Sequence, residues 1–95
     1  MKENIPFFVQ EFSEEMKDAA IHALQNENFV GGESVIKFEE EFAEYIGTKF
    51  AIAVSSGNSA LHLSLISLGI SVNSKVITST NSFIASANCI KMANA

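Results

Sequence analysis

Two short apolar segments, with an almost wholly apolar helix between them, constrain the fold of this chain most. Residues 50–54 and 75–78 are short apolar runs, which are typical of strands covered on both faces. Residues 59–68 have helical spacing but are apolar nearly all round, which predicts a buried helix. A final helix is predicted from residue 81 or 82 to 95, with no stop signal. This βαβα order predicts an α/β fold with parallel strands and a right-handed crossover.

Two amphipathic helices are predicted ahead of this unit. Ser13 is a suitable N-cap for the first, which ends within residues 26–28. After a glycine-containing loop at residues 29–32, the second begins near Ser34 and ends at Gly47. The glutamates at positions 39–41 and 44 could be interpreted as a metal site. A solvated helix face accounts for them fully, so we assign no metal ligand.

The composition indicates a chain that belongs to something larger. Hydrophobic residues make up 47% of its 95 residues and charged residues only 18%. A domain this small has too much surface for its volume to hide so much apolar area. Two predicted strands would also leave unpaired edges. We therefore interpret residues 1–95 as the N-terminal part of a single larger domain.

Charge and cysteine content exclude several classes of protein. The net charge is −5, and all six basic residues are lysines, so no basic patch is available for nucleic acid. No apolar stretch reaches membrane length, and the N-terminus does not resemble a signal peptide. The single cysteine excludes an internal disulfide. These features predict a cytoplasmic protein that binds neither nucleic acid nor membrane.

The turn at residues 54–60, between the first predicted strand and the buried helix, carries the clearest chemical signal. A helix N-terminus presents free N–H groups and the positive end of the helix dipole, which suits a phosphate. Gly57 allows close approach of the backbone, while Ser56, Asn58 and Ser59 add short polar side chains. The alternative is that Ser55 or Ser56 only caps a buried helix. The turn lacks the lysine of a nucleotide P-loop and is not a G-x-S-x-G elbow.

At this turn the chain resembles a known family. Residues 55–62 read S-S-G-N-S-A-L-H, which is similar to the S-S-G-T-A-A-L-H signature of DegT/StrS-type sugar aminotransferases, fold-type I enzymes that use pyridoxal 5′-phosphate (PLP). Residues 5–6, 29–32, 35–47, 68–78 and 82–88 resemble further blocks of that family, in order and at its spacing. Two departures stand out. Asn58 replaces the usual threonine, and residues 70–76 lack the usual glycine and acid before the valine.

The resemblance implies a fold and a cofactor site. Residues 1–95 would comprise N-terminal helices and a βαβα portion of the large PLP-dependent transferase domain, with a mostly parallel sheet. Gly57, Asn58 and Ser59 would hold the cofactor's phosphate, and Phe83 would stack on its pyridine ring. The alternative for Phe83 is a core phenylalanine near a helix start. His62 would be a packed, hydrogen-bonded core residue.

The resemblance also implies an activity for a parent enzyme. That enzyme would transfer an amino group from an amino-acid donor, typically glutamate, to a nucleotide-linked keto-sugar, in the biosynthesis of amino sugars, cell-surface polysaccharides or antibiotic sugars. It would work as a homodimer; a minority branch of the family dehydrates instead. No lysine here resembles the family's catalytic lysine, so we assign no catalytic residue and expect the chain alone to be inactive. The alternative is a non-catalytic small α/β binding or regulatory module.

Overall fold

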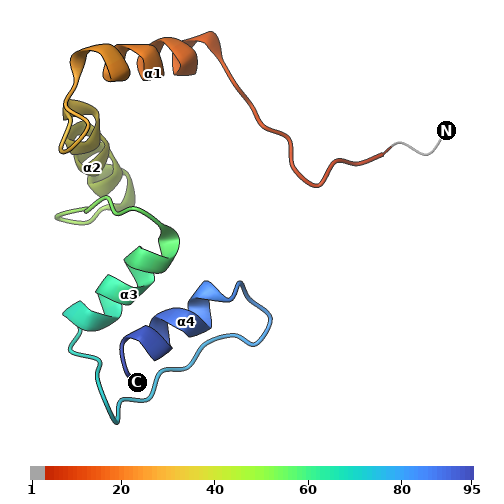
Figure 1. Ribbon diagram of the computed structural model, residues 1–95, viewed down its shortest axis with the longest axis vertical. Helices are drawn as coiled ribbons and strands as arrows, with labels where there is room; N and C mark the ends of the chain where they lie inside the picture. The colour runs from red at the N-terminus through yellow and green to blue at the C-terminus, as the bar shows by residue number, and fades with distance from the viewer. Residues whose placement is uncertain (1–3) are drawn as a thin grey trace. The chain divides into compact units, whose positions relative to one another are not determined.

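The computed structural model describes residues 4–95, in which four helices follow one another along the chain (Figure 1). They are α1 (Glu14–Asn26), α2 (Glu33–Ile46), α3 (Gly57–Ser67) and α4 (Ala85–Met92). The chain divides into two compact units, Met1–Ala51 with α1 and α2, and Ile52–Ala95 with α3 and α4. None of the helices in residues 4–95 combines the length and the apolar character needed to span a bilayer.

The predicted N-cap of the first helix and the predicted C-cap of the second are confirmed. The Ser13 hydroxyl accepts a hydrogen bond from the Met16 N–H at 3.2 Å, so Ser13 caps α1. Gly47 ends α2 in the left-handed region, at φ 78°, which costs glycine little because it has no Cβ. The second helix begins at Glu33, one residue before the predicted start. Local capping chemistry therefore fixes these ends.

The predicted βαβα unit and its parallel sheet are wrong, because residues 4–95 contain four helices and no strand. Residues 50–54 are divided between the two units: Phe50 and Ala51 lie beside α2, whereas Ile52 and Val54 lie beside α3. Residues 76–78 line a hollow of about 230 Å³ with α3 and α4. A strand exists only through hydrogen bonds to a neighbouring strand. These apolar segments contact helices and form no such ladder.

The second unit also differs from prediction in its helices. The predicted buried helix, α3, is exposed on several sides, with Leu63 at 51% and Ile66 at 49%. The last helix spans only Ala85–Met92 and does have a stop signal. Asn94 adopts φ 59°, its N–H bonds the Lys91 carbonyl, and the N–H of the next residue bonds the Ile90 carbonyl. This is a Schellman motif, in which asparagine takes the left-handed position more often given to glycine.

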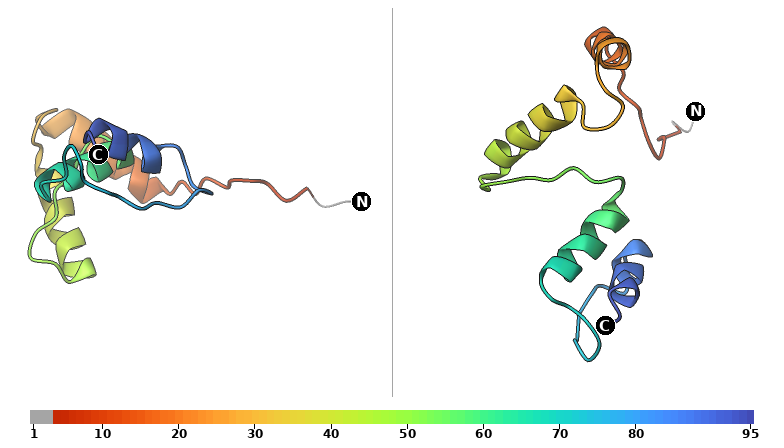
Figure 2. Two further views of the ribbon diagram at one scale, coloured as in Figure 1. Left: turned by 90° about the horizontal axis from the view of Figure 1, so that it is seen from below. Right: turned by 60° about the vertical axis from the view of Figure 1, so that its left-hand side comes forward.

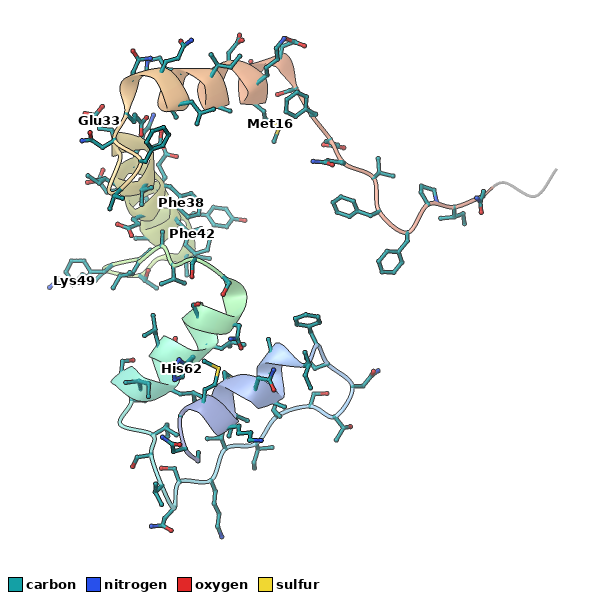
Figure 3. All side chains as sticks on the ribbon, viewed as in Figure 1. Met16, Glu33, Phe38, Phe42, Lys49 and His62 are labelled. Carbon is teal, nitrogen blue, oxygen red and sulfur yellow. The ribbon has the colours of Figure 1, made fainter. Side chains whose placement is uncertain are left out.

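Very little apolar surface is buried. The only buried hydrophobic residues in residues 4–95 are small: Ala43 on α2, Cys89 on α4 and Ala93 just after α4. α3 and α4 pack side by side in the second unit (Figure 2). On α2, the rings of Phe38 and Phe42 lie 5.6 Å apart but stay largely exposed (Figure 3). The structure thus supports the inference from composition that this chain cannot hide its apolar side chains.

A carboxylate joins α1 to α2. Glu27 follows α1, and its carboxylate accepts hydrogen bonds from the Ser34 N–H at 2.9 Å and the Ser34 hydroxyl at 2.5 Å. The N-cap of α2 is Gly32, which has no side chain to cap the helix. The Glu27 carboxylate takes over this role by accepting the hydrogen bond from the Ser34 N–H in the first turn. A Cβ on Gly32 would lie 2.6 Å from the Glu27 carboxylate. Glycine at position 32 is therefore what lets the carboxylate reach α2.

The cap makes the start of α2 sensitive to acid. The bond from the Ser34 hydroxyl, and then that from its N–H, hold the pKa of Glu27 below its ordinary value of 4.5. A lowered pKa means that the contribution to stability is complete above the ordinary value and is lost as pH falls through the lowered one. We expect the protection of the Ser34 N–H, measured against its intrinsic exchange rate at each pH, to fall as pH drops below 4.5, and Glu27→Gln to flatten that dependence. Glu40→Gln, on the same helix, is the control. An unchanged pH profile in the Glu27 variant would contradict this cap.

Candidate functional site

The turn that leads into α3 is built by three serine hydroxyls. Ser56 is the N-cap of α3, and its hydroxyl accepts a hydrogen bond from the Ser59 N–H at 3.1 Å. The Ser59 hydroxyl lies 2.9 Å from that of Ser56 and 3.2 Å from that of Ser55. Of the two predicted caps, Ser56 is therefore the one that caps the helix. These hydrogen bonds link the three serine side chains at the start of α3.

This capping leaves two backbone donors open. Gly57 and Asn58 are the first two residues of α3, so their N–H groups have no acceptor within the helix. In the described part of the chain neither group donates a hydrogen bond elsewhere. A Cβ built on Gly57 would meet no atom within 4 Å, so the space in front of this residue is open. Two N–H groups without an acceptor at the positive end of a helix dipole suit an anion such as a phosphate.

The side chain of Asn58 contacts α4. Its Nδ2 donates to the Met92 sulfur of α4 at 3.7 Å, and its Oδ1 is buried without a partner. The Ser59 N–H is likewise occupied by Ser56. Three predicted residues thus lie together in the first turn of α3. The available donors include the Gly57 and Asn58 backbone N–H groups and the Ser59 hydroxyl, while one N–H of the Asn58 amide is directed to Met92.

The two remaining predicted residues do not join this turn. Phe83 precedes α4, is 79% exposed, and its ring makes no stacking contact within residues 4–95. In residues 4–95 it packs in no core, and no ring contact links it to Gly57 or Asn58. His62 lies on α3 (Figure 3), half-buried and without a hydrogen bond in the described residues. The expected packed, hydrogen-bonded histidine is not observed.

Met92 is a residue of this site that the sequence did not reveal. It lies in the last turn of an amphipathic helix, where methionine normally indicates packing alone. Only the contact with Asn58, 34 positions away in sequence, identifies it. In the residues that the structure describes, no group of three or more histidine, cysteine, aspartate or glutamate side chains could hold a metal ion.

Comparisons with known proteins agree with the motifs of the turn. The model of the DegT/DnrJ/EryC1/StrS aminotransferase family matches residues 10–95. A UDP-4-amino-4,6-dideoxy-N-acetyl-beta-L-altrosamine transaminase of Campylobacter jejuni is 44% identical over 82% of this chain and 20% of its own length. A GDP-perosamine synthase of Caulobacter vibrioides is 44% identical over 62% of this chain and 16% of its own.

A third similar protein, an uncharacterized protein of Methanocaldococcus jannaschii, is 40% identical over 90% of this chain and 22% of its own length. The chain therefore spans about a fifth of the curated relatives it matches. No solved structure matches it.

Proposed function

Since the chain belongs to the DegT/DnrJ/EryC1/StrS aminotransferase family, we propose that it is the N-terminal part of a PLP-dependent enzyme that aminates a nucleotide-linked keto-sugar. The printed names of two relatives, a GDP-perosamine synthase and a UDP-amino-sugar transaminase, support the substrate class. The observation that carries the cofactor proposal is the first turn of α3, with its two open N–H groups. Residues 1–95 would then belong to one large cytoplasmic transferase domain.

The proposed phosphate seat consists of the Gly57 and Asn58 N–H groups and the Ser59 hydroxyl. The N–H groups would bind the phosphate oxygens at the positive end of the α3 dipole. The Ser59 hydroxyl, which now shares hydrogen bonds with its two serine neighbours, could donate to the same anion. Phe83 would supply a stacking face, for which its exposed ring is available. The bound cofactor would withdraw electrons from the reacting carbon, while these residues bind and orient it.

The function is tested on an enzyme that contains this N-terminal region. The purified protein would be incubated with PLP, ¹⁵N-glutamate and keto-sugars linked to GDP or UDP, and the products analysed by mass spectrometry. Appearance of ¹⁵N in an amino sugar is the expected result. Dehydration of the sugar, or no reaction with any nucleotide-linked keto-sugar, would contradict the proposed transfer.

We also propose that the chain associates with itself, in keeping with a homodimeric parent. Exposed side chains such as Phe7, Phe12 and Leu24 cannot be buried within the chain. Burial gains about 25 cal/mol per Å² of apolar surface, so contact between copies is favourable. We expect light scattering to give a mass above 10.3 kDa that falls on dilution. A monomer at high concentration that unfolds cooperatively would instead support a stand-alone binding module.

A further inference from the structure

We infer that Met92 is a positioning residue: through its sulfur, α4 holds the first turn of α3 in the conformation that keeps the Gly57 and Asn58 N–H groups available to a phosphate. This inference rests on the proposed phosphate seat and adds a residue to it. Met92 itself does not touch the anion in this account. Its effect would pass through the side chain of Asn58.

The Asn58–Met92 contact joins two elements that are distant in sequence. Asn58 is the second residue of α3, and Met92 is the last residue of α4. The amide nitrogen lies 3.7 Å from the sulfur, which can accept a weak hydrogen bond. The two residues are 34 positions apart in sequence. The contact therefore connects the beginning of α3 to the end of α4.

The same contact orients the side chain of Asn58. One of the two N–H groups of Nδ2 points to the Met92 sulfur, so the amide lies against α4. The Oδ1 atom is buried and has no partner, so the amide gains nothing else by this orientation. The backbone N–H of Asn58 has no intrahelical acceptor because the residue is second in α3, and the contact with α4 holds this first turn in place.

The role of the Met92 sulfur can be tested by a substitution that keeps the size of the side chain. Met92→Leu keeps the size of the residue but removes the acceptor. Asn58→Ala removes the donor, and the double variant removes both. Met16→Leu, on α1 in the other unit, is the matched control. Each ¹⁵N-labelled chain would be titrated with inorganic phosphate at a protein concentration low enough to limit association, while the N–H signals of Gly57 and Asn58 are followed.

We expect Met92→Leu to raise the Kd for phosphate about threefold, the effect of one weak hydrogen bond, and to shift the Asn58 side-chain amide signals. Asn58→Ala should raise the Kd equally, and the double variant no further, because both act through one contact. Unchanged amide signals and Kd in Met92→Leu would overturn the inference, as would multiplying effects of the two variants. If phosphate does not shift the Gly57 and Asn58 signals of the wild-type chain, the proposed phosphate seat is contradicted. The positioning role of Met92 is then contradicted as well, even if Met92→Leu still shifts the Asn58 side-chain amide signals.

Discussion

Replacing Gly57 with valine is expected to weaken binding of PLP and of inorganic phosphate at least about tenfold, the equivalent of about 1.4 kcal/mol. The valine side chain would occupy the open space in front of the two N–H groups of the first turn of α3. An anion held by backbone N–H groups must approach them closely, so the branched side chain blocks it. The measurement is a titration of both ligands, followed at the Asn58 N–H.

The fold should tolerate this substitution, which keeps the test interpretable. Gly57 does not have a positive φ, and an added Cβ meets nothing within 4 Å. Circular dichroism should therefore show unchanged helix content. Gly57→Ala, with a single added methyl group, should weaken binding less than valine does. Equal affinities in all three proteins would remove this turn from the cofactor site.

The chain alone is expected to transfer no amino group, whichever keto-sugar is supplied. A lysine that forms a covalent bond to the cofactor is activated by desolvation or by a neighbouring cation. The chain has lysines at positions 2, 17, 37, 49, 75 and 91, of which the first lies outside the described residues. The other five are exposed, and two of them pair with acids: Lys17 with Glu14 at 2.8 Å and Lys37 with Glu41 at 3.7 Å.

Borohydride trapping tests whether any lysine of this chain forms a specific covalent bond with PLP. The chain is mixed with PLP, reduced, digested and mapped by mass spectrometry. We expect labelling that is below one equivalent and spread over several exposed lysines, together with no amino sugar. One lysine labelled stoichiometrically, with transfer to a nucleotide-linked keto-sugar, would place catalysis within residues 1–95.

Sequence predicted the parts of the fold that a few neighbouring residues decide. The caps at Ser13 and Gly47 each depend on one side chain or one backbone angle within a single turn. For α3, the sequence left Ser55 and Ser56 as alternative caps, and the structure shows Ser56. The end of α4 is local too, but it depends on Asn94 taking the left-handed position, which asparagine adopts less often than glycine. Glu27 could not be predicted as the cap of α2, because its role depends on how the loop before α2 folds back.

The predicted strands failed because strand formation is not a local property. An apolar run at residues 50–54 or 75–78 indicates a segment whose burial is favourable. Whether it becomes a strand depends on hydrogen bonding to a neighbouring strand. In residues 4–95 these runs lie beside helices instead. The candidate site likewise has a part that depends on local sequence and a part that depends on tertiary packing. The turn around Gly57 could be predicted from its motif, whereas the link from Asn58 to Met92 depends on how α3 packs on α4.

The most direct test of a phosphate seat at α3 compares PLP with pyridoxal, which has the same ring and aldehyde but no phosphate. Both ligands would be titrated into the ¹⁵N-labelled chain while every backbone N–H signal is followed. If the first turn of α3 binds the phosphate, PLP and inorganic phosphate shift the Gly57 and Asn58 signals and pyridoxal leaves them in place. Equal shifts from pyridoxal, or shifts confined to residues outside this turn, would contradict the account.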